Sequence, residues 1–178
     1  MLLCLSWSVS AQEVEGVKLE DTVHLGNSNL LLNGAGVRSK FIFDIYLAAL
    51  YLTANKSSAT SVLTDTGDKR IYLQVLRDIS AEDLLDGFNT AIENNHSETQ
   101  LQAMKIAHQA FENIFHVMVQ VNKGDVITLD YQREVGTQIS VNGGVRGTIA
   151  SAEFYSVLLK IWLGEKPVDD DLKQKLLG

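Results

Sequence analysis

The longest stretch of strand-like sequence runs from Leu30 to Leu52, as LLLNGAGVRSKFIFDIYLAALYL. It predicts two strands joined at a tight corner, with the first strand ending at Gly34 and Gly36, because glycines within a strand pattern mark bulges or close approaches to the backbone. Residues 41–52 are rich in the aromatic and branched side chains that favour strands. Both faces of this second strand are largely apolar, so we expect it to be central and covered on both sides.

Alternation along the second strand separates two phenols. Odd-numbered positions share one face of the strand and even-numbered positions share the other. Tyr46 therefore lies on the face of Asp44, and Tyr51 lies on the opposite face. Either tyrosine could hydrogen-bond a ligand from an apolar wall, but only one can face a given pocket, and we favour Tyr46. The alternative is that both are core tyrosines whose hydroxyls bond to the backbone.

The remaining pattern predicts strands, then helices, then strands, then helices. Period-two alternation predicts strands at residues 12–25, 70–76, 126–132, 137–141 and 145–149. Apolar residues at helical spacing, with capping residues before them, predict helices at residues 59–63, 80–95, 98–118, 152–163 and 169–177. Gly164 is expected to end the fourth helix in the left-handed conformation. This order of elements favours an α+β fold over an alternating α/β fold.

Length and composition point to one globular domain without nucleic acid. The chain has 178 residues, 46% of them hydrophobic, and a net charge of −7 without a basic cluster. No run of the sequence is long and apolar enough to span a bilayer.

Residues 1–11, MLLCLSWSVSA, are uncharged and end in small residues that suit a signal peptidase. We expect an export signal here, residues 12–178 as the mature domain, and a periplasmic location. No lysine or arginine precedes the apolar run, so either the signal begins upstream of Met1 or the segment is not a signal. The single cysteine, Cys4, falls inside it, and a mature chain without cysteine would exclude thiol catalysis.

Arg38 is the candidate for ligand binding. It follows the two glycines in an apolar stretch, where an arginine is costly to bury unless it meets an anion. The planar guanidinium suits a carboxylate, which it can hold through two hydrogen bonds. The alternatives are a salt bridge to Asp44 and an exposed corner.

Metal and cofactor signals are weak. His108, Glu112 and His116 share one helix face, but His108 lies on the apolar stripe and no fourth ligand is apparent. We expect a solvated or interhelical polar edge there rather than a metal site. The sequence contains neither a nucleophile elbow nor a phosphate-binding loop, so no cofactor is expected.

Two motifs carry a family resemblance. GAGVR at 34–38, followed by IYLAALYL at 45–52, and the C-terminal IWLGEKPVDDDLKQKLLG together resemble the chalcone-isomerase-like family, in its bacterial, periplasmic branch. The resemblance implies an open-faced α+β sandwich, in which helices cover one face of a large antiparallel sheet. It also implies a pocket between sheet and helices. In the plant isomerases and the fatty-acid-binding relatives an arginine after this glycine pair faces the ligand, which places that role on Arg38.

The resemblance also bears on catalysis. The plant enzymes carry a tyrosine and an asparagine seven residues apart on the next helix, whereas Glu82 stands seven residues before Asn89 here, and the strand threonine of the enzymes falls near Phe41. The resemblance therefore implies a non-catalytic protein that binds a small apolar carboxylate, with Arg38 at its head and Tyr46 assisting. Two alternatives remain: an isomerase or lyase of a phenolic or enone substrate, with Arg38 steadying an oxyanion, and an envelope interaction module without a ligand.

Overall fold

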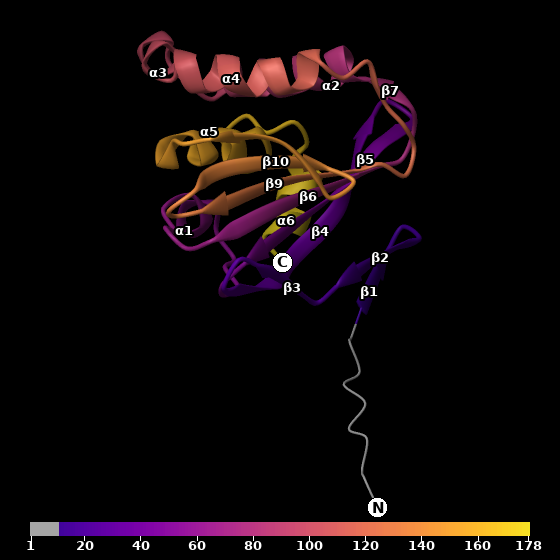
Figure 1. Cartoon of the computed structure of the whole chain (residues 1–178). Coiled ribbons are helices and arrows are strands. Elements are labelled where there is room, and N and C mark those ends of the chain that lie inside the picture. Colours follow the sequence, from indigo (N-terminus) through magenta and orange to yellow (C-terminus); the bar gives the residue numbers. More distant parts are fainter. Residues whose placement is uncertain (1–10) are drawn as a thin grey trace, which may run out of the picture.

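The computed structural model describes residues 11–178 and is built around a seven-stranded antiparallel sheet (Figure 1). Its strands are β3 (Thr22–Leu25), β4 (Ser28–Lys40), β5 (Phe43–Leu52), β6 (Lys69–Val75), β9 (Val126–Gln132), β10 (Gly136–Val141) and β11 (Gly144–Ile149). They are arranged in the order β11-β10-β9-β6-β5-β4-β3. Two short strand pairs stand apart: β1 (Ala11–Val14) forms a hairpin with β2 (Val17–Glu20), and β7 (Ile79–Ser80) pairs with the distant β8 (Gln120–Val121).

Helices cover one face of this sheet. They are α1 (Ala59–Leu63), α2 (Ala81–Asn94), α3 (Glu98–Ala103), α4 (Lys105–His116), α5 (Ala152–Leu163) and α6 (Asp170–Leu176). Side chains of α2, α4, α5 and α6 share one hydrophobic core with the even-numbered residues of β5. Figure 1 shows α2 and α4 outside α5, which lies next to the sheet. The expected α+β sandwich with helices on one face is confirmed.

The other face of the sheet carries a smaller core. Leu47, Ala49 and Tyr51 of β5 pack there with Val17 and Leu19 from β2. The β1–β2 hairpin therefore covers part of the face that has no helices. The prediction that β5 is central and buried on both sides is confirmed, although β1 and β2 form a separate hairpin rather than edge strands of the main sheet.

The corner between β4 and β5 differs from the prediction. Strand β4 does not end at its glycines but continues to Lys40, which pairs with Phe43 across a two-residue turn. A Cβ on Gly34 would collide with the carbonyl oxygen of Lys175, and one on Gly36 would lie 2.7 Å from the Lys175 side chain. These glycines therefore admit α6 to the strand, and a register shift marks a bulge between Leu32 and Gly34.

Two helix ends also differ from the prediction. The helix expected over 98–118 is broken at Met104 into α3 and α4, and α4 ends at His116. Gly164 ends α5 in an extended conformation with φ −69°, not in the left-handed one. A Cβ at Gly164 would collide with Asn95 Oδ1, so the close approach of that side chain accounts for the glycine.

The expected export signal, residues 1–11, lies outside the described residues except for Ala11, the first residue of β1. Within residues 11–178, no helix combines the length and apolar character needed to cross a membrane.

Candidate functional site

Arg38 and Tyr46 are neighbours on the helix-covered face. They stand opposite each other in the β4–β5 ladder, and residues paired in this way point to the same side of the sheet. The guanidinium carbon of Arg38 lies 5.5 Å from the centroid of the Tyr46 ring, which is within the range of cation–π attraction. The structure thus brings together the predicted arginine and the favoured tyrosine.

The guanidinium of Arg38 is incompletely satisfied. Its Nε is buried and has no hydrogen-bond partner among residues 11–178, and none of the ion pairs in this part of the chain includes Arg38. The salt bridge to Asp44 considered from the sequence is not formed, because Asp44 accepts a hydrogen bond of 2.6 Å from Ser39 Oγ instead. A buried donor without an acceptor is costly, so Arg38 carries a hydrogen-bonding capacity that the described part of the chain does not satisfy.

A cleft of about 680 Å³ opens beside Arg38. It lies between the β4–β5 hairpin, one side of α2 and the loop before α6, and its apolar wall is formed by Ile45, Ile79, Ala91, Pro167 and Val168. A Cβ at Gly87 of α2 would lie 3.4 Å from Arg38 Nη1, so the glycine lets the guanidinium approach the helix. The volume falls within the roughly 300–1,000 Å³ of typical small-molecule sites.

The space between sheet and helices behind this cleft is filled by aromatic rings. The Phe88 ring contacts those of Tyr46 and Trp162, with centroids 6.4 and 5.6 Å away, and Phe111 and Phe115 complete the cluster. These side chains are almost completely buried. The open space at Arg38 therefore lies at the edge of the sandwich rather than in its interior.

Tyr46 is held within this cluster as a neutral phenol. Its Oη accepts a hydrogen bond of 3.0 Å from Trp162 Nε1. Burial raises the pKa of Tyr46, and the positive charge of Arg38 opposes part of that rise. The hydroxyl therefore keeps its own hydrogen at neutral pH. Tyr46 is buried behind Arg38 and is not among the residues that line the cleft.

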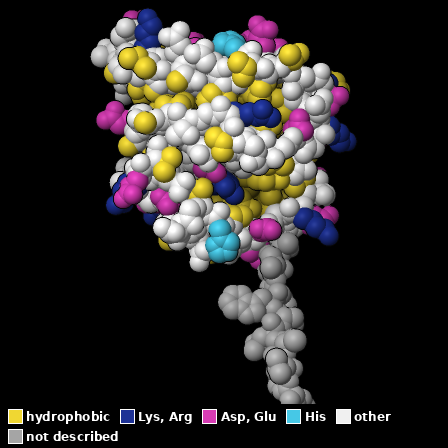
Figure 2. All heavy atoms as spheres, in the orientation of Figure 1, with side chains coloured by type: hydrophobic (Ala, Val, Ile, Leu, Met, Phe, Trp, Pro, Cys, Tyr) yellow, Lys and Arg dark blue, Asp and Glu magenta, His cyan; other side chains and the backbone are white. Residues whose placement is uncertain are grey.

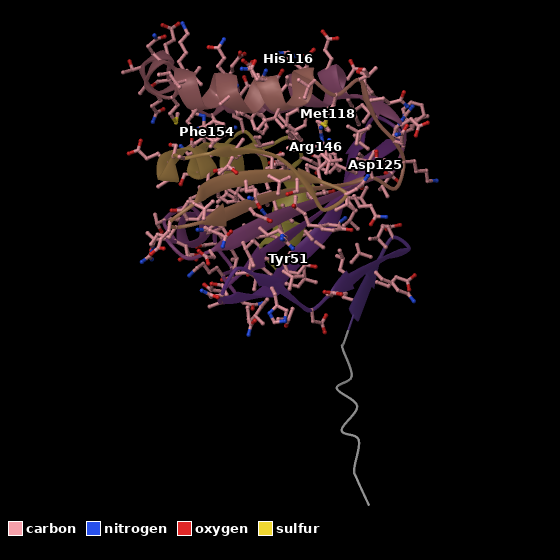
Figure 3. The ribbon with its side chains drawn as sticks, in the orientation of Figure 1. Tyr51, His116, Met118, Asp125, Arg146 and Phe154 are labelled. Carbon is pink, nitrogen blue, oxygen red and sulfur yellow. The ribbon has the colours of Figure 1, made fainter. Side chains whose placement is uncertain are left out.

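Tyr51, the other predicted candidate, is not part of this site. It lies on the opposite face of β5, as Figure 3 shows on the side of the sheet away from α2 and α4. Its hydroxyl donates to the carbonyl oxygen of Glu20 at 3.0 Å, and burial raises its pKa to about 12. This bond is the one expected for a core tyrosine tied to the backbone, although Tyr51 also lines a hollow on that face.

A second hollow, of about 610 Å³, lies on that face under the β1–β2 hairpin. Figure 2 shows hydrophobic side chains at the bottom of a hollow above the start of the grey trace. Arg70 and Asp130 line this groove and form a bidentate ion pair, with nitrogen–oxygen distances of 2.6 and 2.7 Å. This pair was not predicted from the sequence. Arg70 and Asp130 each lie on the polar side of an alternating strand, and this pattern could have suggested that they pair.

The helix face that carries His108 and Glu112 forms a polar edge between helices, as expected. His108 Nε2 lies 2.8 Å from Asn89 Oδ1, and Asn89 Nδ2 donates to Glu112 at 2.9 Å. In the part of the chain that the structure describes, no group of three or more His, Cys, Asp or Glu residues could hold a metal ion. Asn89, the position compared with the isomerases, is therefore committed to α4 rather than to the cleft.

Fold and site together define an open-faced sandwich with an arginine-bearing cleft at its edge. The sequence model described as chalcone isomerase-like matches residues 11–178, and the chain belongs to the chalcone isomerase-like family. Among solved structures it is similar to the crystal structure of an Arabidopsis thaliana fatty-acid binding protein, AtFAP1. That likeness has a TM-score of 0.73 at 16% sequence identity and covers 94% of this chain and 96% of that chain. No curated protein matches the sequence.

Proposed function

We propose that this protein binds a small apolar molecule with an anionic head, such as a fatty acid, without converting it. We place it in the bacterial, periplasmic branch of its family. The observation that carries the proposal is the buried Nε of Arg38, which lacks an acceptor at the wall of a cleft of about 680 Å³. The similarity to a solved fatty-acid binding protein supports the same class of ligand.

The proposed carboxylate lies against the guanidinium of Arg38, which offers two parallel N–H donors. Tyr46, buried behind Arg38, assists by holding the guanidinium through the cation–π contact. The acyl chain follows the apolar wall between Ile45 and Val168. Because the aromatic cluster around Phe88 fills the interior, the cleft favours a short or medium chain whose end remains near solvent.

Catalysis has less support than binding. An isomerase would need polar groups that orient a phenolic substrate. By the family resemblance, Glu82 replaces the helix tyrosine of the plant enzymes and their strand threonine falls near Phe41, which is 92% exposed in a turn. Asn89 is bonded to the neighbouring helix. An interaction module without a ligand is disfavoured by the size of the cleft beside Arg38.

The direct test is calorimetric titration with saturated fatty acids of six to sixteen carbons, comparing the wild type with Arg38→Ala. Losing a charge-assisted pair of hydrogen bonds should weaken binding about 100-fold. Arg146→Ala is the matched control, because Arg146 is exposed on β11 and lies outside the cleft. Equal affinity of Arg38→Ala and the wild type, or no binding by the wild type, would refute the proposal.

The location is tested separately, by fractionation of the producing bacterium and N-terminal sequencing. We expect the protein in the periplasmic fraction, with Gln12 as its first residue. Recovery with the cytoplasmic proteins and an intact N-terminus would contradict this part of the proposal and leave the ligand chemistry untouched.

A further inference from the structure

The turn between β4 and β5 exposes large hydrophobic side chains beside the cleft. Residues 40–43, here called the tip, contain Phe41, Ile42 and Phe43, which are 92%, 88% and 50% exposed. The turn has two residues, because Lys40 pairs directly with Phe43. Lys40 also lines the cleft beside Arg38, so the tip stands at the entrance of the proposed ligand site.

The backbone conformation of this turn does not favour the large side chains that occupy it. Phe41 has φ 58°, and Ile42 is not among the described residues with positive φ. Positive φ at the first central position only is typical of a type II′ turn, which strongly favours glycine there. A phenylalanine in this conformation is strained, and such local exceptions cluster at functional sites.

Cations flank the exposed side chains. The guanidinium carbon of Arg77 lies 4.3 Å from the centroid of the Phe43 ring, and Lys40 begins the turn. Carboxylates also lie close by: Asp44 accepts from Ser39 Oγ and Asp78 from the backbone N–H of Lys123, while Asp83 and Asp86 line the cleft on α2. Lys40 and Arg77 are the cations in contact with the exposed residues, since Lys40 belongs to the turn and Arg77 lies over the Phe43 ring. Apolar and aromatic side chains bordered by basic ones are typical of segments that enter the interface of an anionic membrane.

The size of the tip distinguishes a membrane from a protein partner. Specific protein interfaces bury roughly 800 Å² on each partner, which three consecutive side chains do not provide. A bilayer accepts a narrow apolar projection without a complementary surface, and its anionic headgroups complement Lys40 and Arg77. The observations therefore favour a lipid surface.

We propose that the tip inserts into the interface of an anionic membrane and that the cleft takes up its ligand there. The proposal of insertion is supported by the exposed side chains, the strained turn and the flanking cations. The uptake of ligand at the membrane rests on the proposed function. The two are separable, since Arg38 lies behind the tip and Phe41 does not line the cleft.

The test is vesicle co-sedimentation of the full chain with phosphatidylcholine containing phosphatidylglycerol. The variant Phe41→Gly/Ile42→Ser suits the turn better than the natural residues, so misfolding would not explain a lost interaction. We expect its partition coefficient to fall at least tenfold, and that of Lys40→Ala about fivefold. Ile106→Ser is the matched control, because Ile106 is also 88% exposed and lies at the start of α4, at the other end of the molecule (Figure 1).

A position-specific measurement accompanies this test. Phe41→Trp and Ile106→Trp each add one tryptophan to the two of the parent chain, which give a shared background. Brominated lipids should quench the added fluorescence at position 41 and leave that at position 106 unchanged. Equal quenching at both positions, or unchanged partitioning of Phe41→Gly/Ile42→Ser, would overturn the proposal. So would self-association without vesicles that depends on Phe41, since a second copy would then occupy the tip.

The two proposals fail separately. If the tip variant loses vesicle binding but keeps its affinity for a soluble acid, and Arg38→Ala does the reverse, both proposals stand. If the wild type binds no acid, the ligand proposal alone is refuted. If vesicle binding does not depend on the tip, the insertion proposal alone is refuted.

Discussion

Arg38 and Arg70 lie on opposite faces of the same sheet and have opposite surroundings. Arg70 meets Asp130 in a bidentate pair of 2.6 and 2.7 Å on the face without helices. Arg38, on the helix-covered face, has a buried Nε without an acceptor in the described part of the chain and a cleft beside it. A paired arginine stabilises the fold, whereas one buried without its acceptor lowers stability and marks a place for a ligand.

The tyrosines repeat this contrast. Tyr51 donates to a backbone carbonyl under the β1–β2 hairpin, which completes its hydrogen bonding as part of the core. Tyr46 accepts from Trp162, and its own hydrogen is not used by any hydrogen bond among the described residues. The Tyr51 hydroxyl thus uses its hydrogen within the protein, whereas the Tyr46 hydroxyl does not.

The largest effect is expected from Arg70→Ala, which breaks the completed pair. The Asp130 side chain, only 4% exposed, would be left as a buried charge without its partner, at a cost of about 3 kcal/mol in the free energy of unfolding. Urea denaturation measures this loss. Arg70→Lys keeps the charge without the planar fork and should lose less, and a stability of Arg70→Ala equal to that of the wild type would show that the pair is not structural.

Alkaline pH should lower the stability of the protein through the ionisation of Tyr51. Its folded-state pKa, raised to about 12, exceeds the unfolded value of about 10. The contribution of Tyr51 is therefore fully present below pH 10 and is lost as the pH rises toward 12, by up to roughly 2.5 kcal/mol. The free energy of unfolding, measured by denaturation at pH 9 and at pH 11.5, should differ less between the two pH values for Tyr51→Phe than for the wild type. A slope remains in the variant because burial raises the pKa of Tyr46, Tyr72 and Tyr155 as well.

Tyr46→Phe should cost about 2 kcal/mol of stability, because it leaves the buried Trp162 Nε1 without its acceptor. A double-mutant cycle with Trp162→Phe isolates this hydrogen bond from the cavities that the substitutions create. If the two substitutions have additive effects on the free energy of unfolding, the hydrogen bond contributes nothing to stability.

The smallest stability effect is expected from Arg38→Leu. It removes a cation–π contact and also a buried donor without a partner, so the free energy of unfolding should change by less than about 1 kcal/mol. Binding of an acid should be lost in the same variant. If Arg38→Leu destabilised the protein as much as Arg70→Ala does, the contrast between the two arginines would be wrong.

The sequence predicted the features that depend on nearby residues. Alternation placed Tyr46 and Tyr51 on opposite faces, and the side chain of Ser151 caps α5 by accepting from Phe154 N, where the pattern begins a helix. The pairing of Arg38 with Tyr46 was not predicted, because the first strand was expected to end at the glycines, whereas β4 continues to Lys40.

Features that depend on distant residues could not be predicted. Gly34 suggested the end of a strand, but its space is taken by α6, about 140 positions further along the chain. The Arg70–Asp130 pair requires the register of β6 with β9, which joins strands 60 positions apart. The filling of the interior by Phe88 and Trp162 could not be inferred from helical spacing, because a core and the lining of a pocket share the same apolar stripe.

The contact of α6 with β4 has a consequence for the order of folding. Leu172 and Leu176 belong to the main core, and the Asn33 side chain donates to the Leu176 carbonyl oxygen at 2.7 Å. The chain therefore cannot close this part of its core until residues 170–176 are free to fold, wherever folding takes place. Until then the glycine-lined surface of β4 stays exposed beside Arg38.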